Sequence, residues 1–130
     1  MRSPMARLEI TLPWPPSVNH YWRHVGARTL ISKAGRQYRE DVGAAVLEAR
    51  ASGWDVPVLG RLAVTILVRP PDKRRRDLDN LLKAPLDALE AAGVYDDDSQ
   101  IDSLEIRRGE VGVCGGWLVV VVTGVGDGDS

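Results

Sequence analysis

Prolines divide the chain into short segments and limit the secondary structure that each segment can form. Pro13-Trp14-Pro15-Pro16 follows an alternating run from Leu8 to Leu12, and Pro70-Pro71 follows a second apolar run from Leu62 to Val68. Proline has no N–H for a ladder hydrogen bond, so it is excluded from central strands. Both runs are therefore predicted to be strands that end where the prolines begin.

Pro85 places the same kind of limit on a helix. Residues 78–89 have helical periodicity, with leucines on one face at Leu78, Leu82, Leu86 and Leu89. A proline inside a helix removes a backbone hydrogen bond and costs ~3 kcal/mol, but it is tolerated in the first turn. We therefore expect this helix to begin late, near Leu81 or Leu82, or to be kinked, and to end at Gly93.

The remaining segments complete an α+β pattern. Tyr21–Arg23 and Arg28–Ile31 are predicted to form a hairpin around Val25-Gly26-Ala27. A helix from Lys33 to about Ala51 follows, with Ser32 as its N-cap and Gly53 as its stop. The last predicted strands, 101–107 and 117–123, are joined across a Gly-rich loop. The fold class expected is a mainly antiparallel mixed sheet with two helices packed on one face.

Length and composition favour one ordinary globular domain spanning residues 1–130, with residues 1–6 and 124–130 expected to be frayed. The chain is 44% hydrophobic and 27% charged. No apolar run approaches the ~20 residues that cross a membrane, and the N-terminus has no signal-peptide pattern, so we expect a cytoplasmic protein with no membrane partner. Cys114 is the only cysteine, which excludes an internal disulfide, and it is expected to be an inert buried thiol.

Carboxylates that could bind a metal ion occur in two clusters. Asp77 and Asp79 are spaced i, i+2, and Asp96-Asp97-Asp98 follows. In an extended segment i and i+2 side chains point to the same side, so a metal shared by Asp77 and Asp79 requires that segment to be non-helical. Clustered carboxylates suit hard divalent cations, although a helix N-cap at Asp77 and a solvated turn at 96–98 are the structural alternatives. Neither cluster has the glycine and glutamate of an EF-hand loop, which excludes that calcium motif.

Basic residues lie directly before the first carboxylate cluster. Fourteen of the seventeen basic residues are arginine, whose planar fork grips phosphate oxygens bidentately. The phosphate contacts predicted here are Arg69, Lys73, Arg74, Arg75 and Arg76, and a solvated face is the structural alternative for Arg74–Arg76. His20 and His24 stand four residues apart, but no third zinc ligand is specified, so they are interpreted as groove-lining or packing residues.

The combined pattern resembles the RusA-type Holliday junction resolvases, a small phage-associated family of endonucleases. The matching stretches are Ile10–Ser17 with Asn19, Tyr38-Arg39, Pro71-Asp72, Arg74–Leu81 with Lys83, Asp87-Ala88-Leu89, Gly93 and Asp97–Gln100. They extend from about Leu8 to Thr123. The resemblance places the family's catalytic carboxylates on Asp77, Asp79 and Asp98 and its catalytic lysine on Lys83. The extra Asp96 leaves open whether Asp97 also contacts the metal.

The resemblance also implies a reaction and its partners. Asp77, Asp79 and Asp98 would hold one or two Mg²⁺ ions, with Mn²⁺ able to substitute, and Asn19 and Asn80 would join the DNA contacts. A C2 homodimer would cut a four-way junction by paired symmetric nicks, because two opposed cuts need two equivalent sites. Two alternatives stay open: a non-catalytic binder of junction or duplex DNA, and a nuclease acting on other branched DNA.

Overall fold

A four-stranded mixed sheet forms one layer of the molecule, of which the computed structural model describes residues 7–54 and 58–125. Its strands are β1 (Arg7–Pro13), β4 (Leu62–Arg69), β5 (Ile101–Arg108) and β6 (Trp117–Gly124), in the order β1-β6-β4-β5. β6 runs antiparallel to both β1 and β4, whereas β4 and β5 are parallel. The predicted mixed, mainly antiparallel sheet is confirmed.

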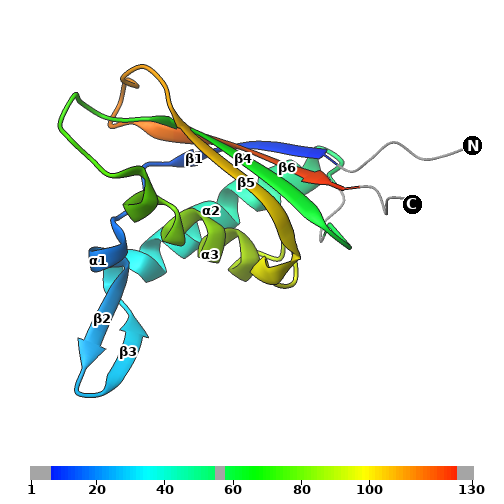
Figure 1. Ribbon diagram of the computed structural model, residues 1–130. Coiled ribbons are helices and arrows are strands. Elements are labelled where there is room, and N and C mark those ends of the chain that lie inside the picture. Colours follow the sequence, from blue (N-terminus) through cyan, green and yellow to red (C-terminus); the bar gives the residue numbers. More distant parts are fainter. Residues whose placement is uncertain (1–6, 55–57, 126–130) are drawn as a thin grey trace, which may run out of the picture.

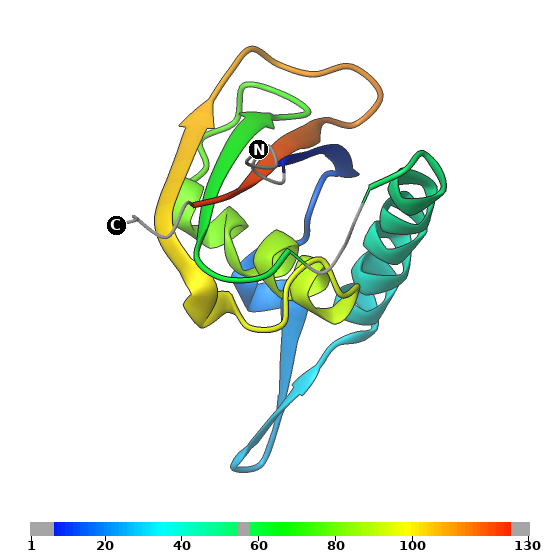
Figure 2. The ribbon, with the colours of Figure 1, turned by 90° about the vertical axis from the view of Figure 1, so that its right-hand side faces the viewer.

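Two helices form the second layer. α2 (Lys33–Ala51) and α3 (Lys83–Ala91) pack against each other and cover the same face of the sheet (Figures 1 and 2), as predicted. A short hairpin of β2 (Trp22–Val25) and β3 (Arg28–Ile31) makes a separate two-stranded sheet that projects away from both layers (Figure 1). The one-turn helix α1 (Val18–Tyr21) at its base was not predicted, because four residues carry too little periodicity to reveal it.

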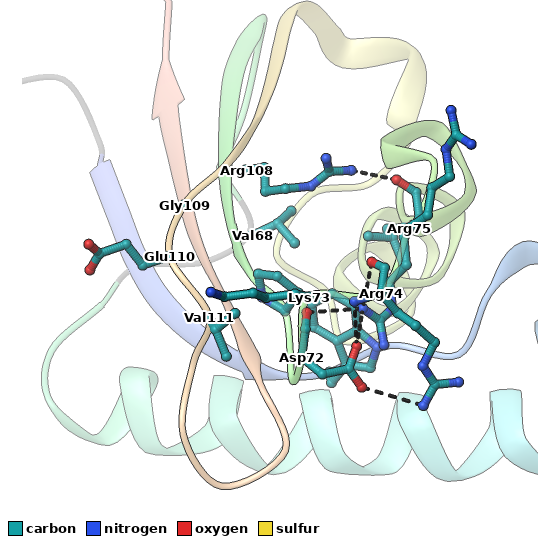
Figure 3. Close-up of a pocket in the computed structure, with 13 residues that line it drawn as sticks. Val68, Asp72, Lys73, Arg74, Arg75, Arg108, Gly109, Glu110 and Val111 are labelled. Atoms are coloured by element: carbon teal, nitrogen blue, oxygen red, sulfur yellow. Dashed lines mark hydrogen bonds and ion pairs between the residues drawn. The ribbon is translucent and has the colours of Figure 1, made fainter.

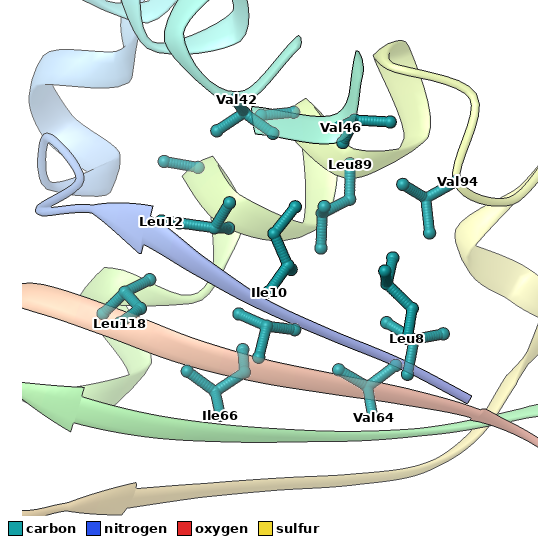
Figure 4. Close-up of a cluster of buried hydrophobic side chains, with 14 of the residues drawn as sticks. Leu8, Ile10, Leu12, Val42, Val46, Val64, Ile66, Leu89, Val94 and Leu118 are labelled. Carbon is teal, nitrogen blue, oxygen red and sulfur yellow. The ribbon is translucent and has the colours of Figure 1, made fainter. Parts of the chain in front are cut away.

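Alternating burial positions the sheet over the helices. Every second residue of β4 is buried, including Val64 and Ile66, and these side chains meet Ile10 of β1 and Leu118 of β6 (Figure 4). Val42 and Val46 of α2 and Leu89 of α3 close the core from the other layer. Each such side chain contributes roughly 1.5–3 kcal/mol when fully buried.

The ends of α2 follow from its sequence. Ser32 Oγ accepts a hydrogen bond from the Gly35 backbone N–H at 2.9 Å, so Ser32 is the predicted N-cap. Gly53, two residues beyond the helix, has a φ of +106°, a conformation that side chains disfavour. The predicted bounds of this helix are confirmed.

Pro85 has the predicted effect on the next helix. A 3-10 helix, η1 (Leu78–Leu81), precedes α3, which starts at Lys83 so that Pro85 is its third residue and lies in the first turn. The late start is therefore confirmed. The expectation that Asp77 and Asp79 both lie in non-helical chain is only half right. Asp77 is extended, with φ −84° and ψ 130°, but Asp79 lies within η1.

Other expectations are corrected or fall outside the described residues. Cys114 is exposed, with a φ of +56°, and is not a buried thiol, because the loop that carries it follows the surface.

Gly124 belongs to β6, and the Val125 N–H donates to the Arg61 carbonyl at 2.8 Å, so the sheet extends one residue beyond the predicted strand. The predicted fraying of residues 1–6 and 126–130 lies outside the described chain. No helix in the described ranges is long and apolar enough to cross a membrane.

Candidate nuclease site

Asp72 organises the arginines of the loop between β4 and η1, residues 70–77, which we call the arginine loop. Its Oδ1 lies 2.8 Å from Arg76 Nη1 and accepts a hydrogen bond from the Arg74 backbone N–H at 2.9 Å, and its Oδ2 lies 3.4 Å from Arg74 Nη2. The hydrogen bond from Arg76 is the largest cause that lowers the pKa of Asp72, to about 2. This carboxylate is therefore ionised at neutral pH and holds the loop in shape.

Arg76 connects the arginine loop to two other segments. Its guanidinium carbon lies 5.5 Å from the centre of the Trp14 ring, a cation–π distance. Its carbonyl accepts a hydrogen bond from the Arg108 side chain at the end of β5. In the described chain Lys73 and Arg75 form no ion pair and are exposed, so their charges are available to a ligand.

Two hollows lie on either side of Trp14 and Arg76. The larger hollow, about 620 Å³, lies between the arginine loop and residues 108–111 (Figure 3). The smaller hollow, about 390 Å³, is lined by Pro15, Ser17, Asp77 and Asn80 together with the residues that both hollows share, Trp14, Arg75, Arg76 and Leu81. The predicted contact Asn80 therefore lines the smaller hollow, beside Asp77.

Asp77 and Asp79 are exposed at the start of the η1–α3 unit. Asp77 occupies the N-cap position of η1, as the structural alternative expected, but its side chain makes no capping hydrogen bond. Asp72, Asp87 and Asp102 are ion-paired with arginines, whereas Asp77, Asp79 and Asp98 have no such partner within the described ranges. Exposed carboxylate oxygens without a cationic partner are the donor set that Mg²⁺ requires, so these residues fit a divalent ion chemically.

Asp97 and Asp98 have different surroundings although they are adjacent. Asp97 caps the short 3-10 helix η2 (Asp98–Gln100): its Oδ1 accepts from the Ser99 N–H at 2.8 Å, and Gln100 Oε1 accepts from the Asp97 N–H at 3.0 Å. The backbone hydrogen bond from Ser99 is the main cause that lowers the pKa of Asp97. The Asp98 side chain makes no comparable bond in the described chain, which favours Asp98 over Asp97 as the ligand.

A third carboxylate joins this pair. Glu90 of α3 has an oxygen within 4.8 Å of both Asp97 and Asp98, and its Oε1 accepts from the Asp98 backbone N–H at 3.1 Å. Asp77 and Asp79 do not belong to this group of three. Sequence reasoning missed Glu90, which falls in the helical pattern of α3 and has no motif of its own. The only available signal was its position eight residues before Asp98.

Lys83 begins α3 and is half-buried. Its Nζ lies 5.5 Å from the centre of the Trp22 ring at the base of the hairpin. The ammonium is therefore held against an aromatic face, which restricts a side chain that is otherwise flexible. Asn19, an exposed residue of α1, lies in the element just before Trp22.

Two motif residues outside the arginine loop hold the helices together. Arg39 of α2 makes an ion pair with Asp87 of α3, Nη2 to Oδ2 at 2.8 Å, and the hydroxyl of the buried Tyr21 donates to the same carboxylate. Burial is the largest cause that raises the pKa of Tyr21. The Tyr38 hydroxyl donates to the Pro13 carbonyl at 2.9 Å and so attaches β1 to α2.

The remaining residues from the sequence analysis are Arg69, His20 and His24. Arg69 lies 5.8 Å from the Trp117 ring centre and pairs with Glu110 at 3.8 Å. His20 and His24 are exposed and bond to near neighbours, Ser17 at 2.8 Å and Thr29 at 3.3 Å. Both are exposed and neither lines the two hollows, so the expectation that they pack into the molecule is wrong.

Comparison with known proteins gives one family. The family model described as Endodeoxyribonuclease RusA matches residues 13–116. A crossover junction endodeoxyribonuclease of Enterobacteria phage HK97 is 41% identical over 119 residues, 92% of this chain and 96% of the relative. The proteins of that name from Enterobacteria phage 82 and Escherichia coli K12 are 41% and 40% identical over 123 residues, 95% of this chain and 99% of each relative. The chain therefore belongs to the RusA family of endodeoxyribonucleases.

Proposed function

We propose that this chain is a Mg²⁺-dependent endonuclease that resolves four-way DNA junctions by paired, symmetric nicks. One observation carries the proposal: Asp77, exposed and without an ion pair in the described chain, is the last residue of the arginine loop whose shape Asp72 fixes. Cations that bind a phosphate backbone and carboxylates that bind a hard cation are thus side by side. The relatives that this chain matches over nearly their whole length are named crossover junction endodeoxyribonucleases, which supports the junction as substrate.

Asp77, Asp79 and Asp98 are the proposed ligands of one or two Mg²⁺ ions, for which Mn²⁺ can substitute. Such an ion supplies polarisation of a phosphoryl oxygen and activation of a water as nucleophile. The protein side chains carry out the rest. Lys73, Arg74 and Arg75 bind the phosphates on either side of the cut, and Arg69, Asn19 and Asn80 extend the contact. Lys83, steadied by Trp22, places a fixed positive charge near the developing negative charge.

A homodimer is part of the same proposal. A four-way junction has nearly two-fold symmetry, and a C2 dimer presents two equivalent sites to it. The arginine loop of each subunit would then direct one of the two opposed strands to its own carboxylates. We place this activity in the cytoplasm, where the DNA substrate of a phage or bacterial enzyme lies.

Cleavage of three substrates tests the proposal. A four-way junction, a flap and a duplex of equal length are incubated with the protein, with and without Mg²⁺, and the products are separated on a denaturing gel. We expect Mg²⁺-dependent symmetric cuts in the junction alone. Asp79→Asn is expected to reduce cleavage at least ~100-fold, because a metal ligand is lost, while junction binding persists.

Asp41→Asn is the matched control, because Asp41 is an exposed residue of α2 that lines neither hollow and is not in the carboxylate group of Glu90, Asp97 and Asp98. This variant removes the same charge and should cleave the junction at the wild-type rate. A wild-type protein that binds the junction and never nicks it would instead indicate a non-catalytic binder. Preference for the flap would indicate a nuclease of other branched DNA. Cleavage by Asp79→Asn at the wild-type rate would overturn the assigned chemistry.

A further inference from the structure

The larger hollow combines an apolar surface with a cationic one, whereas binding a phosphate requires only the cationic surface. Its floor is apolar and is formed by Trp14, Val68, Pro70, Leu81 and Val111. Its rim is cationic and is formed by Lys73, Arg74, Arg75 and Arg108 (Figure 3). At about 620 Å³ it is as large as the ~300–1,000 Å³ pockets that bind small molecules. A bare phosphate would leave this apolar floor unused.

The two carboxylates that line the hollow offset only part of the charge of its five basic residues, Lys73, Arg74, Arg75, Arg76 and Arg108. Asp72 is committed to Arg76 and Arg74 of its own loop. The Glu110 side chain is 94% exposed, points away from the hollow (Figure 3) and lies 3.8 Å from Arg69. The surface therefore suits a ligand with a flat apolar body and an anionic backbone, which is the chemistry of a nucleotide in a DNA strand.

Backbone contacts hold the walls of the hollow in place. The Gly109 N–H donates to the Val68 carbonyl and the Gly112 N–H to the Pro70 carbonyl, each at 2.8 Å. Arg108 donates across the opening to the Arg76 carbonyl. A Cβ on Gly112 would lie 2.9 Å from the Trp117 ring, so glycine allows this close approach. The hollow is thus formed before any ligand enters.

The larger hollow adjoins the smaller hollow, which Asp77 lines. The two share Trp14, Arg75, Arg76 and Leu81. A strand with a phosphate beside Asp77 would therefore bring its neighbouring nucleotide to Trp14 and the apolar floor. Bases can leave the stack for a pocket at a cost of a few kcal/mol, and less where pairing is already disturbed, as at a branch point.

We propose that the larger hollow captures one unstacked nucleobase of the strand that is cut, next to the scissile phosphate, and thereby sets the base preference of cleavage. This inference rests on the proposed nuclease function. The apolar floor holds the base, and the basic rim holds the phosphates that flank it. Trp14 separates the captured base from the reacting phosphate.

Filling the hollow tests this role. Val111 lines the hollow and is 41% exposed, so Val111→Trp places a large side chain inside it without disturbing the core. Val113→Trp is the matched control, because Val113 lies in the same loop, is 69% exposed and does not line the hollow. Cleavage rates are measured on junctions carrying each of the four bases, or an abasic nucleotide, on either side of the cut.

We expect wild-type protein and Val113→Trp to prefer one base by about tenfold or more, the size of a single-base discrimination. Val111→Trp should reduce that preference to within about twofold and cut the abasic junction as fast as the wild-type protein does. An unchanged preference in Val111→Trp, or no preference in the wild-type protein, would overturn the inference.

Two other outcomes can be distinguished from a failure of the base pocket alone. If the wild-type protein cuts no junction at all, the proposed function fails and the base pocket fails with it. If Val111→Trp converts a dimer to a monomer in sedimentation, the hollow receives a second copy of the chain instead of a base. Sedimentation of all three proteins is therefore measured beside the cleavage rates.

Discussion

Asp97 and Asp98 show how two identical adjacent residues acquire different roles. The Asp97 carboxylate accepts the Ser99 N–H and completes a capping box with Gln100, whose amide donates to the Val58 and Gly60 carbonyls. Asp98 is exposed, and its hydrogen bonds in the described chain are made by its backbone: its N–H donates to Glu90 and its carbonyl accepts from the Ile101 N–H. The first residue is therefore suited to stabilising the turn, and the second to binding a ligand.

Alanine at these two positions should separate stability from activity. Asp97→Ala is expected to lower the free energy of unfolding, because the cap of η2 is lost. Asp98→Ala should leave that free energy nearly unchanged and abolish junction cleavage. Urea denaturation and the Mg²⁺-dependent gel assay measure the two effects. Equal losses of stability in both variants would contradict the assigned roles.

The first turn of α2 shows how an element depends on its neighbours. Gly35 is buried where this turn meets the end of α1, and a Cβ there would lie 2.5 Å from the Tyr21 carbonyl oxygen and 2.7 Å from Ile31 Cγ1. Gly43, in the middle of the same helix, has no atom within 4 Å of its Cβ position. The two glycines of this helix therefore differ in the space that their tertiary surroundings leave for a side chain.

Alanine should therefore have opposite effects at these two glycines. Gly35→Ala is expected to destabilise the protein by roughly 1–3 kcal/mol, because the methyl group clashes with a backbone oxygen that cannot move freely. Gly43→Ala should stabilise it by up to about 1 kcal/mol, since alanine is the better helix former. Thermal and urea unfolding measure both changes. A stabilised Gly35→Ala protein would show that α1 and β3 do not pack on α2 as described.

At the scale of the element, local pattern predicted much of this fold. Ser32 and Gly53 mark the ends of α2 because caps and stops act within a few residues. Pro85 delays α3 because its ring excludes it from a helix interior. The parallel pairing of β5 with β4 was allowed by the sequence but not specified, because it depends on how the crossover through η1, α3 and η2 folds back.

The whole molecule is proposed to act as a pair of subunits, each of which makes one nick. This can be tested with a mixed dimer of one wild-type and one Asp79→Asn subunit, purified with two different affinity tags. We expect it to convert a four-way junction mainly to a singly nicked form, because only one of its sites is complete. A denaturing gel with each strand labelled separately reports which strands are cut.

A tagged dimer of wild-type and Asp41→Asn subunits serves as the control and should release two duplexes. Complete resolution by the Asp79→Asn mixed dimer, at the rate of the control, would mean that one site makes both cuts. A wild-type protein that sediments as a monomer on the junction would exclude the paired-site arrangement altogether.

For the candidate site too, the sequence predicted one part and the structure was needed for the rest. The motif from Arg74 to Lys83 indicated the proposed chemistry, because its residue types suit metal and phosphate ligands and its pattern resembles the family motif. Tyr38, Arg39 and Asp87 belong to the same family pattern, yet their contacts show that they join β1, α1 and the two helices. Spacing along the chain could not distinguish residues that serve the reaction from residues that serve the fold.

The sequence by itself determined the approximate bounds of the main strands and helices, which residues are candidates for the reaction, and the family that the chain resembles, but not the short helices α1, η1 and η2. These properties follow from stereochemistry and side-chain chemistry within a few residues. Only the tertiary structure decided that Glu90 joins Asp97 and Asp98, and that Asp97 is used as a cap. The larger hollow also exists only in the tertiary structure. Its two walls lie more than thirty residues apart in the chain, and they meet because β5 pairs with β4.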